Sequence, residues 1–229
     1  MSYLTQLTSE DGHEFSAYVA EPIQNPIGGL VLLQEIFGVN SHIRSVADAY
    51  AAEGYFVVAP AMFDRIEPGV ELGYLGPDMQ KGVALKAAVE ALPVEKVMQD
   101  VAAAVEVAAQ GGRVGVMGFC WGGLLTWRTA CLVPGLSAAV SYYGGGMTHG
   151  AEVERSPRVP VLAHFADQDN HIDLPSVAAF AAAQPNVEVM IHAGQHGFNC
   201  DQRASYDAQA AAQARARTLA FFAEHLAAR

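Results

Sequence analysis

The chain has 229 residues, of which 52% are hydrophobic and 16% charged, and its formal net charge is −11 at pH 7. This length and composition are typical of a globular protein with a large core, and we expect residues 1–229 to form one domain. The acidic balance disfavours nucleic acid and anionic membrane surfaces as partners, because both would require clustered Lys and Arg.

The N-terminal residues and the cysteines indicate the cellular compartment of the protein. The start, "MSYLTQLTSEDG", has no basic region followed by an apolar stretch, so it predicts no signal peptide. No apolar run approaches the length of a membrane span. Cys120, Cys131 and Cys200 are odd in number and widely spaced, which argues against a disulfide framework or a structural zinc site. We therefore expect a cytoplasmic protein in which each thiol must be judged separately.

The pattern of the chain predicts an α/β fold. Residues 3–20 alternate in polarity and are broken by an Asp-Gly turn signal, which indicates an antiparallel hairpin at one edge of a sheet. Continuous apolar runs, typical of strands covered on both faces, occupy 28–37, 55–63, 113–119, 136–144, 159–167 and 187–194. Helical patterns occupy 41–53, 78–91, 95–110, 122–132, 173–184 and 203–228. This alternation predicts a mostly parallel sheet with helices on both faces.

The segment "GFCWGG" places Cys120 directly after a predicted strand and before a predicted helix. The neighbouring glycines give the pattern GxCxG, as a sharp turn from strand to helix requires, since side chains there would collide with adjacent backbone. The start of a helix also favours a thiolate. We therefore interpret Cys120 as a nucleophile, the alternative being a buried structural cysteine.

A nucleophilic thiol requires a base, and the base an orienting acid. In this architecture the expected chain order is nucleophile, acid, histidine. The segment "DQD" after one strand offers Asp167 and Asp169, and "QHGF" after the next offers His196. The residues alone favour His196 as the base and leave both aspartates open as the acid.

An oxyanion hole should combine the N–H group after the nucleophile with one from the loop after an earlier strand. These groups are the backbone N–H of Trp121 and of Ile36. Glu35 precedes Ile36 and could direct its carboxylate to the same place, although a surface position in the loop is equally consistent with the sequence.

The segments "QEIFGVN", "GFCWGG", "DQDNHI" and "HGFNCDQRASYD" together resemble the dienelactone hydrolase family, the carboxymethylenebutenolidases of the α/β-hydrolase superfamily. The similarity runs through nearly the whole chain. It implies an α/β-hydrolase fold in which Cys120 is the nucleophile, His196 the base and Asp169 the acid. It also implies that Glu35 helps to ionise the thiol when substrate arrives.

The resemblance implies cleavage of an enol lactone such as 4-carboxymethylenebut-2-en-4-olide, giving maleylacetate. Family members bind the carboxylate of this substrate with arginines, one of them shortly after the catalytic histidine. Here Cys200 holds that position, the nearest arginine is Arg203, and residues 66–86 offer only Lys81 and Lys86. We therefore expect hydrolysis of esters or lactones with only weak preference for acidic ones.

The remaining expectations concern ligands. Tyr143, Phe198 and Arg203 are candidate substrate contacts, and Cys200 could line the pocket or be packed. His164, His171 and His192 lack a metal-ligand spacing, so we expect neither metal nor cofactor. We expect a monomer or small homo-oligomer that acts on a small ester or lactone. The alternative is a non-hydrolytic α/β-hydrolase-like protein that uses Cys120 for ligand binding or redox sensing.

Overall fold

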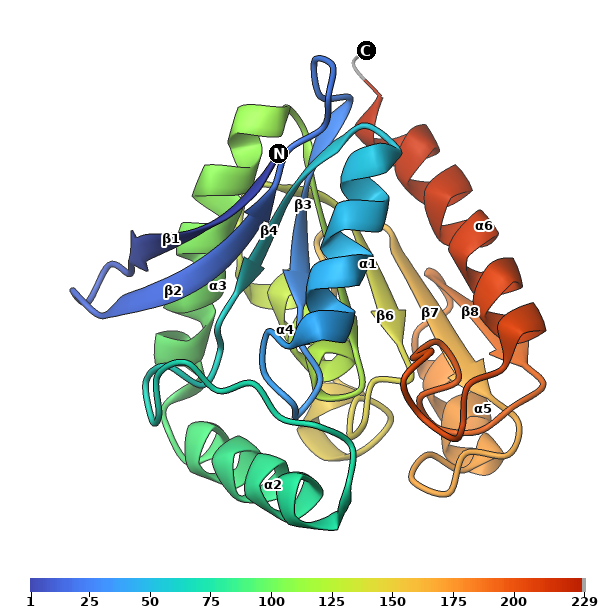
Figure 1. Cartoon of the computed structure of the whole chain (residues 1–229). Helices are drawn as coiled ribbons and strands as arrows, with labels where there is room; N and C mark the ends of the chain where they lie inside the picture. The colour runs from blue at the N-terminus through green and yellow to red at the C-terminus, as the bar shows by residue number, and fades with distance from the viewer. Residues whose placement is uncertain (228–229) are drawn as a thin grey trace.

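An eight-stranded sheet forms the centre of the protein, in the order β1-β2-β4-β3-β5-β6-β7-β8 (Figure 1). The computed structural model describes residues 1–227. The strands are β1 (Ser2–Thr8), β2 (Glu14–Ala20), β3 (Gly28–Leu33), β4 (Tyr55–Pro60), β5 (Val114–Phe119), β6 (Leu136–Tyr142), β7 (Val161–Ala166) and β8 (Val187–His192). The α-helices are α1 (Ser41–Ala52), α2 (Gly76–Glu90), α3 (Val94–Ala108), α4 (Trp121–Leu132), α5 (Leu174–Ala183) and α6 (Ala208–Leu226).

The sheet is parallel except at the edge formed by the N-terminal hairpin. β1 pairs with β2 and β2 pairs with β4 in antiparallel fashion, whereas the remaining pairs are parallel. Gly12 has φ of 83° in the turn between β1 and β2, a conformation that favours glycine. The predicted edge hairpin and mostly parallel sheet are therefore confirmed.

Helices cover both faces of the sheet. In Figure 1, α1 and α6 lie in front of it, and α3, α4 and α5 lie behind it. Every residue of β3, β4, β5 and β7 is buried. This burial on both faces explains why these strands have continuous apolar sequences without alternation.

The strands end earlier than their apolar runs. β3 ends at Leu33, yet Ile36 and Phe37 in the following loop are also buried. The apolar character of this loop therefore reflects packing at the carboxyl edge of the sheet, where parallel α/β sheets place their ligand sites.

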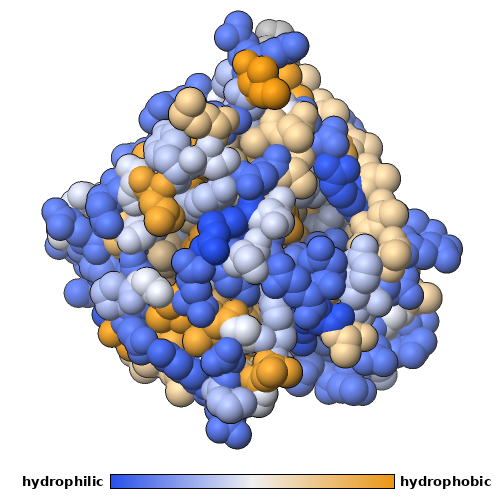
Figure 2. All heavy atoms as spheres, viewed as in Figure 1, coloured by the Kyte–Doolittle hydropathy of each residue, from blue (hydrophilic) through white to orange (hydrophobic). Residues whose placement is uncertain are grey.

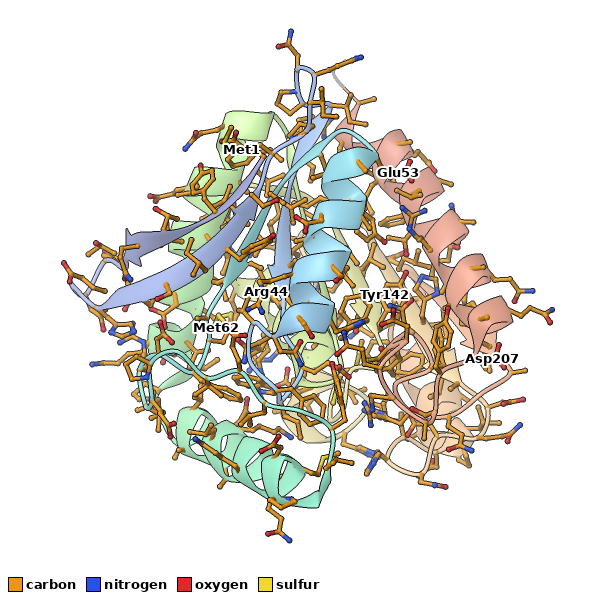
Figure 3. The ribbon with its side chains drawn as sticks, viewed as in Figure 1. Met1, Arg44, Glu53, Met62, Tyr142 and Asp207 are labelled. Carbon is orange, nitrogen blue, oxygen red and sulfur yellow. The ribbon has the colours of Figure 1, made fainter. Side chains whose placement is uncertain are left out.

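Helix α6 begins at Ala208 rather than at the predicted residue 203. Asp207, labelled at the start of this helix in Figure 3, accepts a hydrogen bond from the N–H of Ala210 at 2.8 Å. This side chain caps the helix, and residues 201–207 form turns before it. The predicted end of the helix at residue 228 lies outside the described residues.

Helix α2 lies beyond the carboxyl ends of the strands, at the bottom of Figure 1. Figure 2 shows a largely polar surface on which apolar residues gather in the lower half of the view, the half that holds α2. Val83, on this helix, is 53% exposed. Within residues 1–227, no helix is long and apolar enough to cross a membrane.

Candidate active site

Cys120 forms a strained turn between β5 and α4. Its φ is 55° and its ψ is −114°, in a region that residues other than glycine rarely adopt. The turn is held by the Cys120 N–H, which donates to the carbonyl of Tyr142 at 3.0 Å, and by the Gly123 N–H, which donates to the carbonyl of Cys120 at 3.0 Å. These bonds place the thiol at the N-terminus of α4.

The glycines around Cys120 allow close contact between backbone segments. A Cβ atom on Gly118 would lie 2.4 Å from the carbonyl oxygen of Gly122, and one on Gly122 would lie 2.3 Å from that of Leu33. One on Gly123 would lie 2.6 Å from the carbonyl oxygen of Tyr142. The three glycines are therefore required for α4 to pack directly against the ends of β3 and β6.

This packing predicts the effect of Gly122→Ala on stability. The added methyl group would overlap backbone that cannot rotate away, so we expect a loss of at least about 1–3 kcal/mol in the free energy of unfolding. Gly145→Ala is the matched control, since nothing lies within 4 Å of a Cβ atom at that position. Urea denaturation measures both variants, and equal stabilities would contradict this account of the turn.

His196 is paired with Asp169. Its Nδ1 atom lies 2.7 Å from Oδ2 of Asp169, whose side chain is 1% exposed. The other oxygen of Asp169 accepts from the N–H of His171 at 2.7 Å and from that of Ile172 at 3.1 Å. Asp167 is exposed and instead accepts from the N–H of Gly194. Of the two aspartates left open by the sequence, the structure brings Asp169 to the histidine.

The partners of His196 favour its protonated form. Burial disfavours the charged ring, but hydrogen bonds to Asp169 and Cys120 and the charges of both outweigh it and raise the pKa of His196 to about 10. Burial likewise disfavours the carboxylate of Asp169, yet His196 and two backbone N–H groups lower the pKa of this carboxyl. The arrangement therefore favours an imidazolium that lies between the carboxylate of Asp169 and Cys120.

A cavity of about 350 Å³ opens beside these groups. Its walls are Ile36, Phe37, Met79, Val83, Lys86, Cys120, Gly145, Gly146, His171, His196 and Arg203. The apolar residues come from the loop after β3 and from α2, whereas the thiol and both histidines come from the ends of strands. A small acyl compound fits this volume, with Cys120 and His196 both at the wall.

Glu35 is buried beside this cavity rather than exposed on a loop. Its side chain is 1% exposed, and its Oε1 atom accepts a hydrogen bond from Nη1 of Arg203 at 3.0 Å. Its Oε2 atom is buried without a hydrogen-bond partner among residues 1–227. Gly197 allows this pairing, because a Cβ atom there would lie 2.4 Å from Nη1 of Arg203.

The structure separates the three candidate substrate contacts. Arg203 lines the cavity, but Tyr143 and Phe198 are fully buried and do not. The Tyr143 ring packs edge-on against His196 at 5.1 Å between centroids and against Phe198 at 5.2 Å. The expectation that these two rings contact substrate therefore stays a prediction, and in this structure neighbouring aromatic rings enclose them.

Trp121 and Ile36, the two predicted oxyanion donors, come from the start of α4 and from the loop after β3. Trp121 is the first residue of α4, where a helical N–H group has no acceptor within the helix, and Ile36 lines the cavity. His171 and Lys86 also line the cavity, and neither was predicted as a site residue. The position of His171 two residues after Asp169 is the signal that could have identified it.

Comparison with known proteins shows to which family the chain belongs. The dienelactone hydrolase family matches residues 15–226.

The chain belongs to the dienelactone hydrolase family.

The carboxymethylenebutenolidase of Pseudomonas putida is 33% identical over 227 residues, covering 95% of this chain and 94% of that one. A relative from Synechocystis sp. is 35% identical over 222 residues and covers 88% of both chains. These matches identify a carboxymethylenebutenolidase-like hydrolase of carboxylic esters.

Solved structures show the same fold. A Klebsiella pneumoniae protein assigned as a dienelactone hydrolase superposes with a TM-score of 0.83 at 29% identity, covering 98% of this chain and 99% of that chain. A dienelactone hydrolase-like promiscuous phosphotriesterase from metagenomic libraries gives a TM-score of 0.78 at 20% identity, covering 98% of both chains. The second similarity concerns the fold alone. Together they agree with the α/β-hydrolase architecture predicted from the sequence.

Proposed function

We propose that the protein hydrolyses lactones or esters through an acyl-thioenzyme on Cys120. The observation that carries this proposal is the buried pair of His196 and Asp169 beside a thiol on a strained turn at the cavity wall. Family membership favours hydrolysis over a ligand-binding or redox-sensing role.

In the proposed first step, the Cys120 thiolate attacks the acyl carbonyl and forms a carbon–sulfur bond. The N–H groups of Trp121 and Ile36 stabilise the oxyanion of the tetrahedral intermediate. The carbon–oxygen bond then breaks, and the protonated His196 gives its proton to the departing oxygen. The acyl group remains on sulfur.

In the second step, water attacks the thioester and His196 accepts a proton from it. The carbon–sulfur bond breaks, which returns Cys120 as a thiolate and His196 as an imidazolium. Asp169 holds the ring in one orientation and stabilises its charge throughout.

We further propose that substrates with a carboxylate are favoured, against the weak preference expected from the sequence. Arg203 and Lys86 both line the cavity, so two cationic side chains can face an acidic substrate. A carboxylate that binds Arg203 would compete with Glu35 for the guanidinium. The released Glu35 would then accept the Cys120 proton, in the role that the family resemblance implies. The thiolate of the first step therefore forms when an acidic substrate binds, and Glu35 returns the proton to Cys120 when the product leaves.

Arg203→Met tests the preference for acidic substrates. We expect the ratio of kcat/KM for 4-carboxymethylenebut-2-en-4-olide to that for its methyl ester to fall roughly ten- to a hundredfold, since a charge-assisted hydrogen bond contributes about 1.5–3 kcal/mol. Arg215→Met, which changes an arginine outside this cavity, is the control. An unchanged ratio in Arg203→Met would contradict a carboxylate site at this residue.

A further inference from the structure

Three buried residues outside the lining of the catalytic cavity form a group of potential metal ligands. Glu35, His42 and Cys200 are all buried, and one donor atom of each lies within 4.8 Å of the other two. Glu35 follows β3, His42 lies in the first turn of α1, and Cys200 lies in the loop before α6. The three come from distant parts of the sequence, so no local spacing indicated them.

Two of these side chains have buried polar atoms that lack hydrogen-bond partners within residues 1–227. They are Oε2 of Glu35 and Nε2 of His42, in side chains that are 1% and 4% exposed. A buried polar atom without a partner is destabilising, and such atoms often bind an ion or a water molecule. The opposite oxygen of Glu35 is occupied by Arg203, which leaves Oε2 available.

The orientation of His42 is the one that metal ligands require. Its Nδ1 atom lies 3.0 Å from Oδ1 of Asp201. A carboxylate at Nδ1 holds the ring proton there and leaves the lone pair on Nε2, as in the carboxylate–histidine–zinc arrangement. Asp201 thus supports His42 as a ligand without entering the ligand set.

We propose that Glu35, His42 and Cys200 form a binding site for Zn²⁺. One thiolate, one imidazole and one carboxylate are ligands that this ion commonly takes, with a fourth position left for water. Tetrahedral coordination with bond lengths of about 2.0–2.3 Å places the donor atoms roughly 3.3–3.8 Å apart. The donor atoms here lie within 4.8 Å of one another, so binding requires side-chain shifts on the order of 1 Å. The Cys200 thiolate and the carboxylates of Glu35 and Asp201 together balance the divalent cation and the guanidinium of Arg203.

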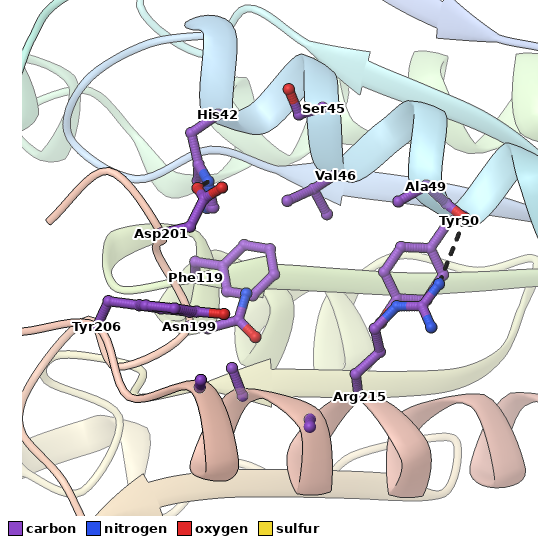
Figure 4. A pocket seen from close by; sticks show the side chains of 13 residues that line it. His42, Ser45, Val46, Ala49, Tyr50, Phe119, Asn199, Asp201, Tyr206 and Arg215 are labelled. Atoms are coloured by element: carbon purple, nitrogen blue, oxygen red, sulfur yellow. Dashed lines mark hydrogen bonds and ion pairs between the residues drawn. The ribbon is translucent and has the colours of Figure 1, made fainter.

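A second cavity lies beside His42. His42 and Asp201 line a separate cavity of about 370 Å³ between α1 and α6. Figure 4 shows these two side chains together at one end of it and Arg215 beside Tyr50 at the other. Cys120 is not among the residues that line this cavity.

Zinc bound at this site should inhibit hydrolysis, an effect that rests on the proposed function. Glu35 is the residue assigned to activation of the thiol, and a metal bond to its free oxygen would hold it away from Cys120. Occupancy would therefore slow acylation without any contact between the metal and the nucleophile.

Cobalt spectroscopy of the Cys120→Ala protein tests metal binding apart from catalysis, because this variant lacks the competing thiol. Titration with Co²⁺ under reducing conditions should give one equivalent of bound metal and a thiolate-to-cobalt charge-transfer band in the near ultraviolet. Adding Cys200→Ser should remove the band, and adding Cys131→Ser, which changes a buried cysteine of α4, should preserve it. No band in Cys120→Ala, or a band that survives Cys200→Ser, would overturn the site.

His42→Gln provides the second variant, should Cys200→Ser fail to fold as judged by circular dichroism. In the Cys120→Ala background it should also remove the band, and retention of the band would overturn the proposal. With Cys120 intact, Zn²⁺ should inhibit ester turnover at least tenfold less effectively in His42→Gln than in the unsubstituted protein. Equal inhibition of both would show that zinc acts at Cys120 and would refute the inhibitory role.

Discussion

Cys120→Ala should reduce hydrolysis of p-nitrophenyl acetate by on the order of 10⁴-fold or more, because removal of a nucleophile removes covalent catalysis altogether. The methyl side chain leaves the turn glycines and the pair of His196 and Asp169 in place. The oxyanion donors and the cavity would retain some acceleration over the reaction in water. The measurement is steady-state kcat/KM with freshly reduced protein.

Cys131→Ala is the control for this prediction. Cys131 is buried within α4, unlike Cys120, and its burial raises the pKa of its thiol to about 12. This variant should keep nearly full activity. If Cys120→Ala retained more than a tenth of the normal turnover, Cys120 would not be the nucleophile.

Asp169→Asn should lower kcat by about 10²- to 10⁴-fold, the range found when the orienting acid or the general base is disabled. It should also lower the pKa of His196 from about 10, because the carboxylate that favours the imidazolium is lost while burial continues to favour the neutral ring. NMR titration of the His196 ring measures this shift directly.

The same substitution changes how stability depends on pH. The folded-state pKa of His196 exceeds the ordinary value of 6.5, so protonation of this ring stabilises the fold fully below pH 6.5. That contribution is lost as pH rises towards 10. The free energy of unfolding should therefore fall less steeply across this window in Asp169→Asn than in the unsubstituted protein.

Asp167→Asn is the matched control, since Asp167 lies two residues away, is exposed and contacts the Gly194 N–H instead of His196. Its kcat and its His196 titration should be nearly normal. If the two variants gave the same pH titration, the structural assignment of Asp169 as the partner of His196 would be wrong.

The pattern of apolar residues along the chain was sufficient to predict the mostly parallel sheet covered by helices. Strands such as β3 and β5 are buried on both faces and are therefore apolar throughout, while the hairpin at the edge alternates. The predicted nucleophile position also followed from local rules, because only glycine fits at Gly118 and Gly122 where backbones approach closely. Strong local constraints made these features visible in the sequence.

Contacts between distant segments were not predictable in the same way. The sequence left Glu35 equally consistent with a surface position, because its burial depends on Arg203, which lies far along the chain. The same contact places Arg203 in the cavity, although its position in the sequence differs from that of the family arginine. Tyr143 lies at the end of a predicted strand and Phe198 follows one, as substrate contacts would, but the two rings pack against each other and are buried.

Mass spectrometry of the reaction in progress tests the central proposal most directly. The protein is mixed with excess p-nitrophenyl acetate, quenched in acid within milliseconds and digested, and the peptide that contains Cys120 is examined. An acyl-thioenzyme predicts a transient acetyl group on Cys120, formed in step with the burst of p-nitrophenol and lost as substrate is exhausted. Turnover with no acyl group on Cys120, or with an acyl group on another residue that follows the same time course, would contradict it.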